Sequence, residues 1–134
     1  MERLNQRLAV AKRAVASFEE LLNKPAATLV ERDAAIQRFE YTVEAVWRLA
    51  QRYLEVVEGL SGGSPKAVIR LCRETALLTE AQATLALEMI DDHNLTVHTY
   101  NEQIAQQIYS RLPRYASVAD AWTKRIEANL SQQH

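Results

Sequence analysis

Residues that could do chemistry are concentrated in one ten-residue stretch, 91–100, which reads DDHNLTVHTY. Most of the remaining sequence follows an ordinary amphipathic helical pattern. In a continuous α-helix, Asp91, Asn94 and His98 would share one face because their spacings are three and four. His93 would lie about 140° around that helix from His98, so a single helix could not aim both imidazoles at one small target. A bend, or a second copy of the chain, could bring them together.

Several kinds of site are compatible with this stretch. It could be a junction between two helices, with Asp91 and Asp92 solvated and Thr99 opening a capping box with Glu102. A metal site would need Asp91, His98 and a third ligand, but no second histidine follows at a four-residue spacing, so we expect no bound metal. A serine-based triad is not indicated either, because no serine occupies a nucleophile elbow.

Acid-base catalysis on a phosphodiester is the remaining chemical interpretation. A histidine can remove the proton of a ribose 2′-OH near neutral pH, while a nearby cation stabilises the charge that develops on the phosphate. In this interpretation His98 is the acid or base, and Asn94 orients it or the phosphate. Arg111, Arg114, Arg70 or Arg73 could supply the cation.

The bulk composition predicts long helices in a single domain, 1–134. The chain has 134 residues with only three Gly and three Pro, so few turns are available.

A net charge of −1 gives no global basic field of the kind that drives nonspecific nucleic-acid binding. The single cysteine, Cys72, excludes an internal disulfide and is expected to be a buried thiol. Without a membrane-length apolar run or a signal peptide, we expect a cytoplasmic protein with no membrane contact.

Apolar residues recur at spacings of three and four in two N-terminal segments, 4–22 and 36–57. The first should end near Asn23, because the lysine that follows precedes a proline. Thr28–Glu31 has the pattern of a capping box and should open the second helix. Gly59 should close that helix.

The C-terminal half has a similar organisation. Ser64–Pro65 predicts the start of a short helix, whose apolar residues lie in 68–78. Thr79–Gln82 is a second capping-box pattern and predicts a new helix that leads into the polar stretch. A final stripe, 104–126, contains Pro113, which should kink or split it. With no strand pattern present, the sequence predicts an all-α fold: an antiparallel, up-and-down four-helix bundle with an extra short helix.

Three segments resemble a known family, the nucleotidyltransferase substrate-binding proteins, a branch of the HEPN superfamily. They are 38–44 (RFEYTVE), 64–66 (SPK) and 88–100, and the resemblance extends from about Leu29 to Tyr115. It implies a HEPN-like helical bundle that forms a homodimer. It also implies a toxin-antitoxin pair, in which the HEPN subunit is an endoribonuclease toxin and a minimal nucleotidyltransferase is the antitoxin.

The HEPN signature is an arginine, four to six residues and a histidine, with a tyrosine two residues later in this branch. By this resemblance His93 stands at the arginine position, Asn94 is the polar residue that follows, His98 is the catalytic histidine and Tyr100 is the tyrosine. Asp91 and Asp92 are supporting residues. The resemblance further implies that the partner enzyme, using ATP and Mg²⁺, transfers AMP to Tyr100 and silences the toxin. It implies no cofactor for this chain itself.

The chain departs from the signature at His93, because histidine is mostly neutral at pH 7 whereas arginine is a permanent phosphate donor. Phosphate stabilisation should therefore be weaker and pH dependent. Two functions follow. One is a metal-independent endoribonuclease acting on RNA, and the other is a non-catalytic subunit that docks to a nucleotidyltransferase and presents its substrate.

Overall fold

The computed structural model describes residues 1–26 and 28–132, and within these ranges it contains helices and no strands. The five α-helices are α1 (Glu2–Leu21), α2 (Leu29–Tyr53), α3 (Pro65–Glu74), α4 (Glu80–Leu95) and α5 (Glu102–Gln132). A π-helical turn, Leu54–Glu58, extends α2, and a 3₁₀ turn, Thr96–His98, follows α4. The prediction of an all-α bundle of four long helices and one short helix is confirmed.

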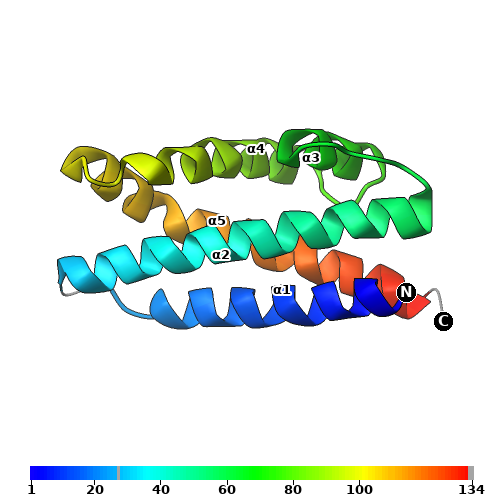
Figure 1. Cartoon of the computed structure of the whole chain (residues 1–134), viewed down its shortest axis with the longest axis horizontal. Helices are drawn as coiled ribbons and strands as arrows, with labels where there is room; N and C mark the ends of the chain where they lie inside the picture. Colours follow the sequence, from blue (N-terminus) through cyan, green and yellow to red (C-terminus); the bar gives the residue numbers. More distant parts are fainter. Residues whose placement is uncertain (27, 133–134) are drawn as a thin grey trace.

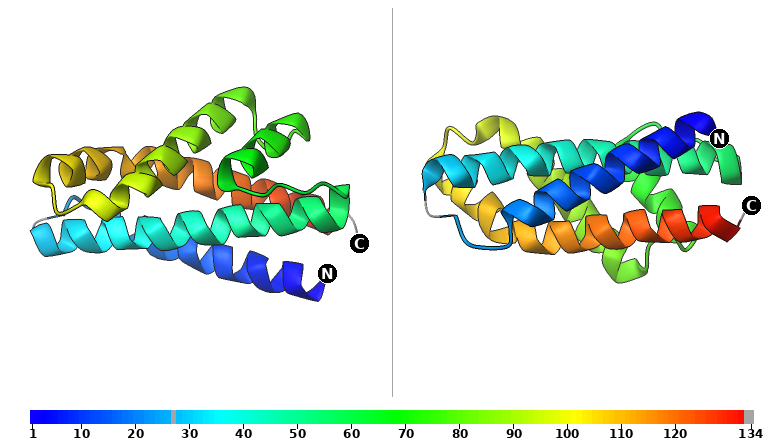
Figure 2. Two further views of the ribbon diagram at one scale, coloured as in Figure 1. Left: turned by 45° about the horizontal axis from the view of Figure 1, so that its top comes forward. Right: turned by 90° about the horizontal axis from the view of Figure 1, so that it is seen from below.

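The helices are arranged around a central pair, α2 and α5 (Figure 1). Helix α1 packs across both members of this pair on one side, and α3 and α4 pack on the other side (Figure 2). The start of α1 and the end of α5 lie together at one end of the bundle. The connection from α4 to α5 lies at the opposite end, where α2 begins. The polar stretch 91–100 therefore lies far from the start of α1 and the end of α5.

Local sequence signals explain where the helices begin. The Thr28 hydroxyl accepts a hydrogen bond from the backbone N–H of Glu31 (3.1 Å), and Ser64 accepts one from Ala67 (3.2 Å). Thr79 and Gln82 form a complete capping box, with reciprocal bonds of 3.1 Å and 2.9 Å. These bonds satisfy backbone donors that a helix N-terminus otherwise leaves free. The three predicted helix starts are confirmed.

The end of the second helix has a feature that the sequence did not predict. The last turn, Leu54–Glu58, widens to a π-helix before the chain leaves at Gly59, whose φ of 68° lies in the left-handed region that favours glycine. Of the two effects expected of Pro113, the split is wrong, because α5 continues through it as one element.

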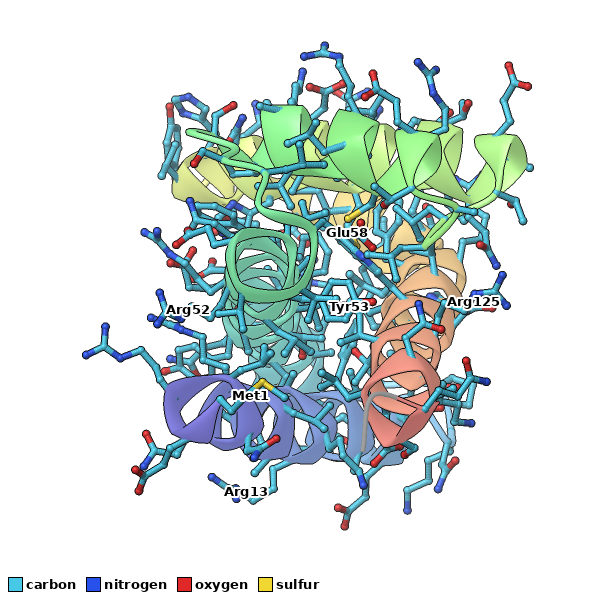
Figure 3. The ribbon with its side chains drawn as sticks, turned by 90° about the vertical axis from the view of Figure 1, so that its right-hand side faces the viewer. Met1, Arg13, Arg52, Tyr53, Glu58 and Arg125 are labelled. Carbon is cyan, nitrogen blue, oxygen red and sulfur yellow. The ribbon has the colours of Figure 1, made fainter. Side chains whose placement is uncertain are left out.

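The core runs the length of the central pair and is dominated by aromatic and branched side chains. Trp122 and Tyr115 of α5 are at most 1% exposed, and Tyr53 of α2 points between α2 and α5 (Figure 3). The Tyr53 hydroxyl accepts a hydrogen bond from Asn129 Nδ2 (3.3 Å). Cys72 is fully buried, as predicted.

Among the described residues no helix combines the length and apolar character needed to cross a bilayer.

Candidate functional site

The polar stretch does not form one continuous α-helix. Helix α4 ends at Leu95, and the 3₁₀ turn that follows is held by hydrogen bonds from the Thr96 hydroxyl to the His93 carbonyl (2.7 Å) and from Thr99 to Thr96 (3.1 Å). The placement of Asp91, Asn94 and His98 on one helical face was therefore wrong for His98. Short polar side chains that bond back to the preceding turn compete with helix continuation, which accounts for the change.

The start of α5 was also misassigned. The prediction that Thr99 and Glu102 form a capping box is wrong, because Asn101 Oδ1 accepts from the backbone N–H groups of Gln103 (3.0 Å) and Ile104 (3.2 Å). Glu102 instead pairs with the buried Arg32 of α2. This ion pair fixes the beginning of α5 to the beginning of α2, next to the turn that carries His98.

His98 and Tyr100 form a pair on this turn. His98 Nδ1 lies 3.1 Å from the Tyr100 hydroxyl, and the two rings meet edge to face with centroids 5.7 Å apart. Both side chains are exposed, and Tyr100 retains 83% of its accessible surface. A titratable imidazole hydrogen-bonded to an exposed phenol can exchange a proton with it, while both groups stay open to a large substrate.

His93 lies in a different environment. It is half-buried, and its ring meets that of Phe39 on α2 edge to face, with centroids 6.3 Å apart. It also contributes to the electrostatics of Glu44. Partial burial raises the pKa of Glu44, but hydrogen bonds from Trp47 and Arg48, together with the field of His93, outweigh burial and hold it below its ordinary value. His93 is thus directed toward α2, and no hydrogen bond within the described chain joins it to His98.

Asp92 is buried, not solvated as the junction interpretation expected. Its carboxylate accepts two hydrogen bonds from Arg111 Nη1 (3.0 and 3.1 Å) and one from the Tyr115 hydroxyl (2.6 Å). Burial and the neighbouring carboxylate both raise the pKa of Tyr115, so the phenol remains a donor. Asp92 therefore joins the end of α4 to the middle of α5. Sequence reasoning missed this cluster, although an arginine beside the apolar stripe of α5 was a signal for a buried counter-charge.

Asp91 and Asn94 lie on the outer side of α4. Asp91 forms an ion pair with Lys66 of α3 (2.6 Å), and both side chains remain substantially exposed. The Asn94 side chain is exposed and makes no hydrogen bond within the described residues. A shallow pocket of about 310 Å³ next to Asp91 and Asp92 is also lined by Arg111. The guanidinium of Arg111 is thus already paired with a carboxylate.

The other arginines considered as cations, Arg70, Arg73 and Arg114, are exposed. None of the three forms an ion pair in the described part of the chain. Across residues 1–26 and 28–132 there is no group of three or more His, Cys, Asp or Glu side chains arranged to hold a metal ion. The chemistry available at the turn is therefore the proton exchange of the His98–Tyr100 pair.

Comparisons with known proteins agree with this architecture. A crystal structure of a protein from Thermus thermophilus is 53% identical in sequence, with a TM-score of 0.84, and the match covers 87% of this chain and 98% of that one. A comparison with curated protein sequences gave no significant match.

More distant structures share the fold. One is described as the toxin-antitoxin MntA-HpeT (15% identity, TM-score 0.79, covering 96% of this chain and 99% of that one). Another is a tri-AMPylated Shewanella oneidensis HEPN toxin in complex with MNT antitoxin (16% identity, TM-score 0.76, covering 93% and 96%). The sequence model of the family "nucleotidyltransferase substrate binding protein like" matches residues 6–128. This chain, with its five-helix bundle and its exposed histidine-tyrosine turn, belongs to that family.

Proposed function

We propose that this chain is the HEPN subunit of a toxin-antitoxin pair with a nucleotidyltransferase, that it cleaves RNA through His98, and that AMP transfer to Tyr100 silences it. The observation that carries the proposal is the 3.1 Å contact between His98 Nδ1 and the Tyr100 hydroxyl on an exposed turn. The descriptions of two structural relatives as toxin-antitoxin proteins, one of them AMPylated, support it.

The cleavage step requires only proton transfer and charge stabilisation. His98 Nε2 accepts the proton of a ribose 2′-OH, and the 2′-oxygen then attacks the adjacent phosphorus. The bond from phosphorus to the 5′-oxygen breaks, and a second acid protonates that oxygen. The products carry a 2′,3′-cyclic phosphate and a 5′-hydroxyl. We include a homodimer in this proposal, and the group that protonates the 5′-oxygen is then the protonated His98 of the other copy.

Modification of Tyr100 would block this step. The phenol oxygen attacks the α-phosphorus of ATP, pyrophosphate leaves, and the phenol proton passes to His98 Nδ1 or to water. The product carries a bulky anion on Tyr100, next to the imidazole that must approach RNA. Its charge repels the substrate phosphate, and its volume fills the space where RNA would lie. Because Tyr100 is 83% exposed, a partner enzyme can reach it without unfolding the turn.

The arginine position is the weak point for catalysis. His93 is half-buried against Phe39, and Arg111 is already paired with Asp92. A charge-stabilising cation is worth several kcal/mol in comparable sites, so we expect slow cleavage.

The test compares wild-type protein with His98→Ala and with Val97→Ala as a matched control on the same turn. Induced expression in bacteria should arrest growth for wild type and Val97→Ala but not for His98→Ala. Purified protein should convert a labelled RNA to fragments with 2′,3′-cyclic phosphate ends. No arrest and no cleavage between about pH 5.5 and 8 would contradict the nuclease proposal.

The orientation of His93 favours a second candidate, a non-catalytic subunit that docks to the nucleotidyltransferase and presents or recognises its substrate. This role requires no cation beside His98. Co-purification with the protein encoded next to this one, followed by incubation with labelled ATP, separates the candidates. A stable complex without labelling of Tyr100 and without RNA cleavage favours docking, whereas failure to associate contradicts both.

A further inference from the structure

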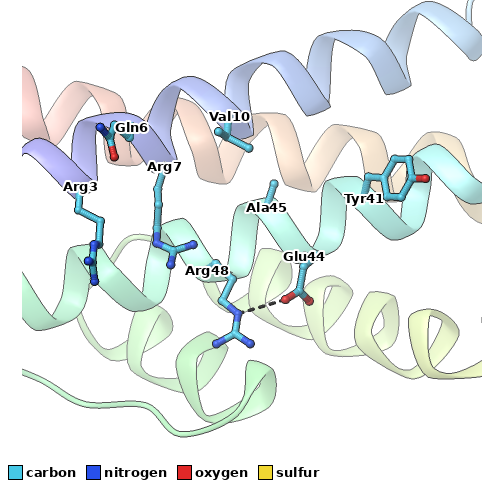
Figure 4. A pocket seen from close by; sticks show the side chains of 8 residues that line it. All are labelled: Arg3, Gln6, Arg7, Val10, Tyr41, Glu44, Ala45 and Arg48. Atoms are coloured by element: carbon cyan, nitrogen blue, oxygen red, sulfur yellow. Dashed lines mark hydrogen bonds and ion pairs between the residues drawn. The ribbon is translucent and has the colours of Figure 1, made fainter.

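A second candidate site lies away from the His98 turn, in a groove between α1 and α2 (Figure 4). The groove is open and has a volume of about 580 Å³. Arg3 and Arg7 of α1 and Arg48 of α2 gather toward one end, and Tyr41 lies toward the other. This volume is within the range of sites that hold small ligands such as cofactors.

The basic end carries more positive charge than the chain as a whole. Its three arginines face a single carboxylate, that of Glu44, whereas the whole chain has a net charge of −1. Arg48 is held in place, since its Nε donates to Glu44 (3.1 Å) and its guanidinium lies 4.2 Å from the Trp47 ring centroid. Arg3 and Arg7 form no ion pair within the described part of the chain. Two guanidinium groups are therefore available to an anion.

The positions of Arg3 and Arg7 suit a phosphate. They are four residues apart on α1, so they lie on the same face, about 6 Å apart along the helix axis. Guanidinium groups bind phosphate oxygens in a fork geometry. An isologous contact between two copies through this groove would bring the same arginines together, and repulsion between like charges opposes it.

The other end of the groove suits a base. Tyr41 retains 57% of its accessible surface and Val10 retains 47%, although both are apolar and lie on a folded bundle. Proteins that bind single-stranded nucleic acid combine a positive groove with aromatic side chains on which bases stack. The same combination fits one nucleotide, with its phosphates on the arginines and its base on the tyrosine.

We propose that the groove between α1 and α2 is a nucleotide-binding site, separate from the His98–Tyr100 pair, in which Arg3 and Arg7 hold phosphate and Tyr41 stacks on the base. The nucleotide could belong to single-stranded RNA or be free, for example ATP. The proposal does not depend on RNA cleavage, because binding can be measured in protein that carries His98→Ala.

Fluorescence anisotropy tests the proposal with two probes, a labelled single-stranded RNA oligonucleotide and a fluorescent ATP analogue, at several salt concentrations. All proteins carry His98→Ala, so that RNA is bound but not cleaved. The test variant is Arg3→Glu with Arg7→Glu. The matched control is Arg13→Glu with Lys24→Glu, which makes the same change in net charge outside the groove. Arg13 lies on the outer side of α1 (Figure 3). Circular dichroism checks that both proteins fold.

The test variant should lose at least tenfold in affinity for one or both probes, and the control should lose much less. For RNA, loss of two phosphate contacts should reduce the slope of log K against log salt by about 1.4. Tyr41→Ala should weaken binding by about fivefold or more without changing that slope. A loss confined to RNA identifies the strand as the ligand, and one confined to the ATP analogue identifies the free nucleotide.

Three outcomes would overturn the proposal. One is unchanged affinity of the test variant for both probes, and another is an equal loss in the control, which would indicate a general charge effect. The third is loss of association with the nucleotidyltransferase while nucleotide affinity is retained, which would make the groove a protein interface. Failure of the nuclease proposal, by contrast, would leave these binding results unaffected.

Discussion

At the scale of single residues, the hydrogen bond between His98 and Tyr100 bears on which imidazole nitrogen can act as a base. If Nδ1 donates its proton to the tyrosine oxygen, Nε2 is unprotonated and free to accept a proton from RNA. If the phenol donates to Nδ1, Nε2 carries the proton and is a donor. The AMP transfer to Tyr100 that we propose would remove the phenol proton and place a phosphate close to the ring. It would therefore change both the access to His98 and the hydrogen bond at its Nδ1.

Tyr100 should be the tyrosine that accepts AMP. Incubation with the nucleotidyltransferase and ATP, followed by peptide mass spectrometry, should find AMP on Tyr100 and not on the other four of the chain's five tyrosines, which serve as internal controls. The reason is access and a nearby base, since Tyr100 is exposed beside His98 whereas Tyr115 is buried and donates to Asp92. Tyr100→Phe should abolish labelling. Equal labelling of another tyrosine would contradict this assignment.

Cys72 should give the protein an alkaline instability. Burial raises the pKa of its thiol from 9.0 to about 12, so the folded chain keeps the proton that the unfolded chain releases. The retained proton therefore stabilises the folded state fully below pH 9, and this stabilisation declines as pH rises toward 12. Between pH 8 and 10.5, wild type should therefore lose about 2 kcal/mol more unfolding free energy than Cys72→Ala. Urea unfolding at both pH values measures the difference, and identical pH dependence would refute it.

At the scale of elements, Asp92 should be the main polar link between α4 and α5. Removing its carboxylate leaves Arg111 and Tyr115 without their partner, and loss of one member of a buried ion pair costs about 3 kcal/mol or more. We expect about 2–4 kcal/mol for Asp92→Ala, because Arg111 is partly exposed. Asp91→Ala, which removes the exposed pair with Lys66, should cost less than about 1 kcal/mol. Equal losses in urea unfolding would contradict this distinction.

The helix boundaries were predictable where a local signal determines them. The Ser64 hydroxyl accepts from the N–H of Ala67, and Pro65 has no N–H to satisfy. Thr79 and Gln82 likewise satisfy donors within four residues, so the pattern alone is sufficient. The end of α4 was not predictable in this way. Two threonine hydroxyls bond back to carbonyls and end the helix before His98, and the same residues are compatible with a continuous helix in the sequence.

Contacts between elements distant in sequence could not be predicted. Asp92 lies 19 residues from Arg111, and Arg32 lies 70 residues from Glu102. Helical periodicity indicates which face of each helix is buried, but not which residues of two helices meet. The arginine groove was missed for the same reason, because it forms only when α1 and α2 pack side by side. His98 and Tyr100 could be singled out because they are two residues apart.

At the scale of the whole molecule, the bundle places its two candidate sites on different surfaces. The His98 turn is at the end where α2 and α5 begin, and the groove runs between α1 and α2 (Figures 1 and 4). The two sites share no residue, so a substitution in one can be tested without altering the other. One chain offers only one exposed histidine on the turn, whereas cleavage needs both a base and an acid. The homodimer that we propose would supply both if it pairs two turns.

This requirement gives a prediction about mixed dimers. If each cleavage event uses the His98 of both copies, a dimer with one His98→Ala copy is inactive. Random pairing of equal amounts of wild-type and variant chains leaves about a quarter of the dimers fully wild type. Nuclease activity per total dimer should therefore fall to about a quarter of the wild-type value, whereas independent sites would retain about half. Co-expression with two affinity tags, followed by isolation of the doubly tagged species, makes the comparison direct. Inactive mixed dimers would assign the acid to the second His98, and half-active ones would require the acid to come from the same chain or from water.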